Sequence, residues 1–261
     1  MRDAWPDSVT PGGSTAPLGA RGDLCGEPRA GTEHGAPSSA LAEPLGSLPF
    51  VGSPWLVAAV LGAALAAYAA IAADVVEHGR LSALDEDLSA WVARSMPTAA
   101  EWIARVLSWV GGWIGVTIVV VVVLVWLLRR GEAALAALLV VVVLGGQLLN
   151  AVSKDGYDRP RPTAGSPIEL PSSSSFPSGH AMTGIAVFGL LGLVFARELA
   201  SARARAAAIV AGFALGVLVG ASRVVLNVHF LTDVLGGAAL GLAWLAVCLL
   251  LGILLGARRR R

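Results

Sequence analysis

Six long apolar runs, separated by polar segments, dominate the pattern of the chain after about residue 54. They cover residues 55–73, 107–128, 133–150, 181–196, 206–221 and 234–256. A helix needs about 20 apolar residues to cross a bilayer. Five consecutive valines at 119–123 would also suit a buried strand, but the long apolar run around them favours a membrane helix. The pattern predicts an all-α, polytopic membrane protein with six transmembrane helices in a bundle.

A mixed segment, 74–106, differs from these runs because polar and apolar residues alternate with a helical period. Leu81, Leu84, Leu88, Trp91 and Val92 recur at that spacing, with the acidic group 85–87 between them. An apolar stripe beside a charged face is typical of a helix that lies along a surface. We therefore expect an amphipathic surface helix here and not a seventh span.

The first 50 residues follow another pattern. Eight of the 14 prolines precede Trp55, among many Gly, Ser and Ala, and no apolar period survives. Such a composition predicts a disordered tail. The expected organisation is a tail at 1–50, a six-helix membrane domain at 51–257 and a basic end at 258–261.

The composition and the charge exclude further classes of binding site. Hydrophobic residues make up 56% of the chain, and the net charge is only +1, without the basic patch that nucleic-acid binding requires. The two cysteines, Cys25 and Cys248, stand in unlike surroundings, and no Cys/His cluster has metal-ligand spacing. We expect no nucleic-acid partner, no cofactor and no metal.

Arginines mark one side of the predicted bundle. They follow the second span (129–130), the fourth span (197, 203, 205) and the sixth span (258–261), which six crossings place on the side of both termini. The positive-inside rule makes this side cytoplasmic. The chain is thus predicted to be a multi-pass protein of the plasma (inner) membrane. Segments 74–106, 151–177 and 222–233 then meet on the outer face.

Three polar clusters lie on that outer face. The segment 154–162 carries Lys and Arg, the segment 177–180 is a Pro-Ser-Gly-His turn before a helix, and 222–233 holds an Arg and a His–Asp pair. Cations and helix N-terminal N–H groups suit a phosphate. A His and an Asp four residues apart share a helix face, so the carboxylate can fix the imidazole tautomer.

Each cluster alone has an ordinary structural explanation. The cations could be a charged loop at headgroup level, Pro-Ser-Gly a helix-starting turn, and His229–Asp233 a structural pair. Their meeting on one membrane face favours a functional site. It lacks the carboxylate pair of a metal site and a serine nucleophile elbow.

Glycines at four-residue spacing (212, 216, 220, then 237 and 241) form a stripe of small residues on the last two spans. Such stripes let neighbouring helices approach closely. We interpret them as contacts within the bundle; a homodimer face is the alternative.

The three clusters match, in order, the signature motifs of a known family: Lys154-x6-Arg161-Pro162, Pro177-Ser178-Gly179-His180 and Ser222-Arg223-x5-His229-x3-Asp233. The chain therefore resembles the type 2 phosphatidic acid phosphatase superfamily over about residues 55–256. The resemblance implies a metal-independent membrane phosphatase that hydrolyses a lipid phosphate or an isoprenyl or lipid diphosphate through a phosphohistidine.

The resemblance also implies residue roles. His229 would be the nucleophile, Asp233 would orient it, and His180 would be the general acid and then the general base. The phosphate would be bound by Lys154, Arg161, Arg223, Ser178 and Gly179. A side chain at Gly179 would crowd the phosphate.

Several polar residues receive no role: Asp155, Asp158 and Arg159 of the first cluster, and the serines 172–175, which we expect to be a flexible loop. Two other functions stay open. A phosphotransferase would pass the phosphoryl group to a lipid or sugar acceptor, and a non-catalytic transporter or scaffold would keep only the anion site. The intact His180, His229 and Asp233 argue against the second, because binding alone needs neither an acid nor a nucleophile.

Overall fold

The computed structural model describes residues 53–163, 165–168, 170 and 172–258. The predicted tail at 1–50 and the arginines after residue 258 lie outside these residues. Helices make up the regular structure of the described part, which confirms the all-α prediction. They are α2 (Pro54–Glu77), α3 (Arg80–Ser95), α4 (Thr98–Gly111), α5 (Trp113–Arg129), α6 (Ala133–Asp155), α7 (Gly179–Thr183), η1 (Gly184–Phe188), α8 (Gly189–Ala196), α9 (Ala202–Val225) and α10 (Leu231–Arg258).

Five helical segments are long and apolar enough to cross a membrane, and α4 with α5 brings the number to six if this bent pair is one span. The six predicted runs thus correspond to helices. The second run, predicted as one transmembrane helix, is divided between α4 and α5, and the chain bends by 51° between them. Gly112 interrupts the helix there with an extended conformation (φ −74°, ψ 169°). Residues 98–106, assigned by pattern to the surface segment, belong to α4.

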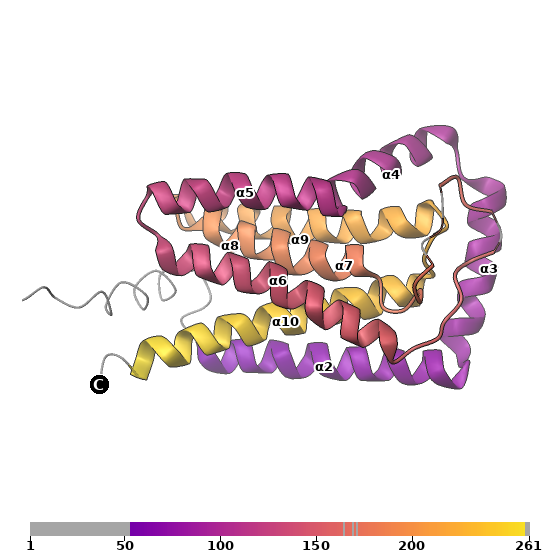
Figure 1. The fold of residues 1–261 in the computed structure, drawn as a ribbon, viewed down its shortest axis with the longest axis horizontal. Coiled ribbons are helices and arrows are strands. Elements are labelled where there is room, and N and C mark those ends of the chain that lie inside the picture. Colours follow the sequence, from indigo (N-terminus) through magenta and orange to yellow (C-terminus); the bar gives the residue numbers. More distant parts are fainter. Residues whose placement is uncertain (1–52, 164, 169, 171, 259–261) are drawn as a thin grey trace, which may run out of the picture. The chain divides into compact units, whose positions relative to one another are not determined.

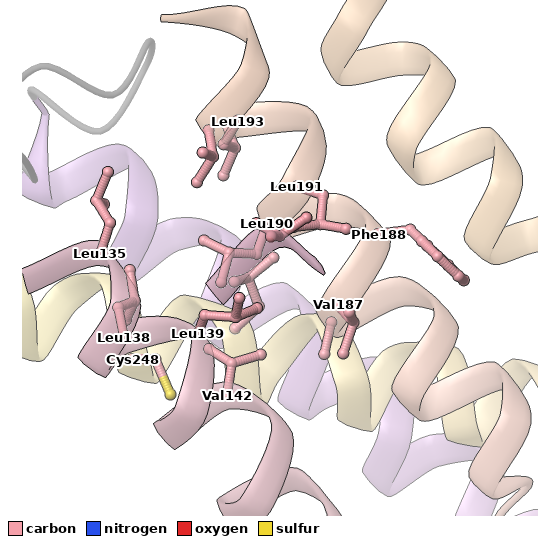
Figure 2. Packing of buried hydrophobic residues seen from close by; sticks show 14 of the residues in the cluster. Leu135, Leu138, Leu139, Val142, Val187, Phe188, Leu190, Leu191, Leu193 and Cys248 are labelled. Carbon is pink, nitrogen blue, oxygen red and sulfur yellow. The ribbon is translucent and has the colours of Figure 1, made fainter. Parts of the chain in front are cut away.

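The apolar core lies along the middle of α6, η1, α8 and α10. Figure 2 shows Leu135, Leu139 and Val142 of α6 facing Val187 and Leu190, with Cys248 of α10 beside them. These side chains are nearly inaccessible to solvent. The segment 179–196 is the most enclosed of the candidate spans, with 78% of its apolar window buried inside the protein. It is therefore the central helix, around which the others pack.

The glycine stripes make contacts within the bundle, as the sequence predicts. A Cβ on Gly216 would lie 2.7 Å from the Gly184 carbonyl oxygen, and one on Gly212 would lie 2.4 Å from that of Phe188. A Cβ on Gly241 would lie 2.3 Å from the Met182 carbonyl oxygen. Only glycine allows backbones this close. The central helix is thus held between α9 and α10.

Helix α3 lies across one end of the bundle, where α2 and α6 end and α10 begins (Figure 1). It is the predicted amphipathic helix, but of the five residues in its apolar stripe only Val92 is buried. Leu84 and Trp91 are exposed, whereas Asp85 and Ser89 are buried together with Val92. Hydrophobic periodicity alone does not predict a polar inner face, which forms here because Asp85 has a buried partner.

The α5–α6 and α8–α9 connections lie at the opposite end of the bundle from α3 (Figure 1). Arg129 ends α5, and Arg130 and Arg197 lie in these connections. The described cationic ends of the spans and the three polar clusters thus occupy opposite ends, as the sequence pattern predicts.

Candidate active site

The nucleophile predicted from sequence lies in the short turn between α9 and α10. His229 precedes the first residue of α10, so the His–Asp spacing crosses a helix start and does not lie within one helix. Its Nδ1 is 3.4 Å from Oδ2 of Asp233. The same oxygen accepts a 2.9 Å hydrogen bond from the Phe230 N–H. Asp233 therefore caps α10 and faces the imidazole with one carboxylate oxygen.

The second nitrogen of His229 faces a cation. Nη1 of Arg161 lies 3.1 Å from Nε2 of His229. A guanidinium can only donate, so Nε2 accepts and the ring proton is on Nδ1, toward Asp233. Burial lowers the pKa of His229 to about 4, although Asp233 opposes this shift. The imidazole is thus neutral at pH 7, with a lone pair on Nε2, as a nucleophile requires.

Arg161 is fixed by more than the histidine. It donates to the carbonyl oxygens of Val228 (2.9 Å) and Ser173 (3.2 Å). Lys154, at the end of α6, donates to the Ser174 carbonyl oxygen at 2.5 Å. Burial lowers the pKa of Arg161. The backbone oxygens of Ser173 and Ser174, in the serine loop that received no role from the sequence, thus bind two of the three predicted phosphate-binding cations.

Arg223 enters from the last turn of α9 and is buried. Its Nη1 donates to the hydroxyl of Ser108 on α4, while its Nε is buried without a partner. An unpartnered buried donor is costly. Such an atom suits an anion-binding site.

His180 is the second residue of α7 and stands at the α4–α5 bend. A Cβ on Gly112 would lie 3.7 Å from its Nε2. Arg223, His229 and Arg161 are all close enough to act on it electrostatically. The structure therefore brings both predicted histidines and two predicted cations to one place.

Ser178 is the N-cap of α7, and Gly179 is the first residue of that helix. The Ser178 N–H donates to the Asp233 carbonyl oxygen at 2.9 Å, and its hydroxyl is buried without a partner. A Cβ on Gly179 would lie 2.9 Å from Nδ2 of Asn150. Asn150 thus supplies a reason for this glycine that lies in the protein itself and was missed from sequence.

The sequence also missed Asp85 and Arg159. Arg159 donates to Oδ1 of Asp233 at 2.6 Å and to Oδ2 of Asp85 at 2.8 Å. Its only signal in the sequence was its place inside the first motif, at a position that the motif does not specify. Asp85 had a weaker signal, an acidic residue on an amphipathic helix. Within the described ranges, no three His, Cys, Asp or Glu side chains are grouped as metal ligands.

Comparison with known proteins places these features in context. Residues 134–253, which include all three clusters, match the model of the PAP2 superfamily. The chain is 45% identical over 98 residues to "Phosphatidylglycerophosphatase B" of Bacillus subtilis (strain 168), covering 37% of this chain and 47% of the relative. The match thus spans about half of the relative's length.

A solved structure is also similar: the "first transmembrane PAP2 type phosphatidylglycerolphosphate phosphatase from Bacillus subtilis". It superposes with a TM-score of 0.63 at 27% sequence identity. The superposition covers 74% of this chain and 93% of that one. The similarity therefore extends beyond the motifs to the helix bundle.

Proposed function

We propose that this chain, which contains a PAP2 superfamily domain, is an integral membrane phosphatase that hydrolyses a lipid phosphate or diphosphate through a phosphohistidine. One observation carries the proposal: His229 has a carboxylate at Nδ1 and a guanidinium at Nε2. A phosphoryl group bonded to Nε2 would meet Arg161 at once. A purely structural histidine has no use for a cation at its free lone pair.

In the first step, the Nε2 lone pair of His229 attacks phosphorus, and the bond from phosphorus to the leaving oxygen breaks. His180 gives its proton to that oxygen, so the alcohol or phosphate monoester leaves with this oxygen protonated. The ring becomes a cationic phosphoimidazole, whose Nδ1 proton faces the Asp233 carboxylate. Asp233 thereby stabilises the charge that the nucleophile gains.

In the second step, His180 accepts a proton from water, and the water oxygen bonds to phosphorus. The phosphorus–nitrogen bond breaks, its electron pair returns to Nε2, and inorganic phosphate leaves. One histidine thus acts first as an acid and then as a base, and the protons balance over the cycle.

The cations stabilise the phosphoryl oxygens in both steps. Arg161, Arg223 and Lys154 supply fixed positive charge, and the free hydroxyl of Ser178 adds a donor. Donors held in place before the reaction are most effective where negative charge develops. Because these side chains supply that charge, we propose a metal-independent reaction.

The substrate follows from where the site lies. It stands at the end of an apolar bundle, so an amphiphile can keep its tail in the bilayer while its phosphate reaches the cations. The names of both relatives support phosphatidylglycerol phosphate as a substrate. Phosphatidic acid and isoprenyl diphosphates are the other members of the class. The arginines at the opposite end support an outward-facing site with both termini in the cytoplasm.

Phosphate release from a panel of these lipids, measured on detergent-purified protein, tests the proposal. We expect turnover that a chelator does not reduce and an acid-labile phosphoprotein in rapidly quenched reactions. His229→Ala should lose both, whereas His78→Asn, at an exposed histidine with φ 53°, should retain both. Chelator-sensitive turnover, or normal turnover in His229→Ala, would refute the mechanism. Phosphoryl transfer to an added lipid or sugar alcohol in place of water would favour a phosphotransferase.

A further inference from the structure

We propose that Asp85 and Arg159 are positioning residues, which hold the Asp233 carboxylate in the orientation that His229 needs. The inference rests on the proposed function, because it assigns these two residues a part in that reaction. The two side chains link α3 to the nucleophile through an unbroken series of hydrogen bonds.

The guanidinium of Arg159 is the centre of this series. It donates through Nη1 to Asp233 and to the Thr232 hydroxyl (2.7 Å), and through Nη2 to Asp85. Its Cζ lies 4.6 Å from the centre of the Phe230 ring. A guanidinium packed on a ring and bound on two edges has little freedom to rotate. Arg159 is therefore a fixed support for the carboxylate.

Burial argues that this support has a use beyond stability. The side chains of Asp85, Arg159 and Asp233 are 2%, 12% and 0% exposed. Apolar residues of similar volume are often as stabilising as a buried ion pair, because the charges must lose their water. The exposed apolar residues Leu84 and Trp91 on the same helix could have formed such a contact. The polar inner face of α3 is consistent with a role in positioning the Arg159 guanidinium next to Asp233.

The support matters because other cations compete for Asp233. Lys154 and Arg161 both interact electrostatically with this carboxylate. With Oδ1 occupied by Arg159, Oδ2 is left for the His229 ring and the Phe230 N–H. Without Arg159, the carboxylate could rotate toward Arg161 and withdraw from the imidazole. The substrate phosphate would then meet a poorly oriented nucleophile.

Asp85 in turn fixes both Arg159 and the start of α10. Its Oδ1 accepts from the Thr232 N–H at 3.1 Å, and its Oδ2 binds the Thr232 hydroxyl. One turn along α3, the Ser89 hydroxyl donates to the side-chain oxygen of Asn227 at 2.8 Å. The backbone of Asn227 has a left-handed conformation, with φ 51°. Helix α3 thus forms hydrogen bonds with residues on both sides of His229, Asn227 before it and Thr232 after it.

The test compares Asp85→Asn with Asp87→Asn, the same change at an exposed position two residues along α3. Asn keeps the shape of the side chain and removes its charge. We expect Asp85→Asn to lower kcat by about ten- to a hundredfold with KM changed less than about twofold, because the misplacement acts on chemistry and not on binding. Asp87→Asn should equal the unmodified protein. Equal kinetics in the two variants would overturn the proposal.

Vanadate binding gives a readout that needs no turnover. Vanadate bonded to an imidazole nitrogen copies the five-coordinate transition state, whereas inorganic phosphate copies the ground state. In vanadium and phosphorus NMR titrations, Asp85→Asn should bind vanadate about tenfold more weakly and phosphate as before. Equal losses for both anions would indicate a disturbed anion site and would overturn the positioning role. If the unmodified protein neither binds vanadate nor releases phosphate, the proposed function itself fails.

The paired variant Asp85→Asn/Arg159→Gln removes both side-chain charges together and tests whether the two residues act through each other. If the two residues act in one series, the paired variant should lose about as much kcat as the more affected single variant. Arg159→Lys keeps the positive charge but not the planar guanidinium with its two donor edges. It should recover part of the kcat that is lost in Arg159→Gln. Additive losses, or no recovery by Lys, would contradict a shared positioning role.

Discussion

The two ends of the bundle both contain arginine–carboxylate pairs, and the pairs of Arg159 and of Arg130 differ sharply in burial. At the α3 end, Arg159 joins two nearly inaccessible carboxylates. At the opposite end, Arg130 is 2.9 Å from Glu198, with side chains 45% and 29% exposed. The exposed pair can exchange with water at little cost, while the buried one cannot. Similar chemistry thus forms an exposed surface pair at one end and a buried network at the other.

The largest effect is expected from a substitution that removes the reacting group at the buried end, the imidazole of His229. His229→Asn should lower phosphate release by at least about ten thousandfold, because removing a nucleophile eliminates the covalent route. Melting in detergent should change little. Turnover within tenfold of the unmodified protein would show that the buried end owes its organisation to something other than this reaction.

The second effect compares the pairs directly. Arg159→Ala leaves two carboxylates buried and unpaired and should destabilise the protein by about 3–5 kcal/mol. Arg130→Ala breaks an exposed pair and should cost at most about 1 kcal/mol. Unfolding of both variants measured in the same detergent gives the comparison. Equal losses would remove the distinction between the two ends.

A third effect concerns the middle of the bundle, which both ends share. Gly216→Ala places a Cβ 2.7 Å from the Gly184 carbonyl oxygen and should cost about 1–3 kcal/mol. Gly62→Ala is the matched control, since nothing lies within 4 Å of its Cβ position. Thermal melting checks both. A destabilised Gly62→Ala would mean that the effect comes from glycine itself and not from close packing.

The smallest expected effect is the dependence of protein stability on pH that comes from His229. The pKa of His229 is lowered from 6.5 to about 4, so the folded state binds fewer protons than the unfolded state between these values. The stability contribution of His229 is therefore complete above about pH 6.5 and is lost as pH falls toward about 4. Nitrogen NMR of histidine-labelled protein should show a neutral ring down to about pH 5. Ordinary titration near 6.5 would contradict its burial.

The sequence predicted the spans and the gathering of His180, His229, Asp233 and the cations well, because apolar length and arginine placement are strong physical signals. It did not predict the bend at Gly112, since a glycine within an apolar run is compatible with a straight helix. It also missed Asp85 and Arg159. A buried charge looks like a solvated one until its partner is known, and this partner is 74 residues away.

The close approach of α10 to the start of α7 has a mechanical consequence. A Cβ on Gly237 would lie 2.4 Å from the Ser178 carbonyl oxygen, and the Ser178 N–H binds the Asp233 carbonyl oxygen. His180 and His229 are therefore mounted on one rigid block whose parts touch backbone to backbone. We therefore expect the separation of the two histidines to change little if the outer helices of the bundle tilt.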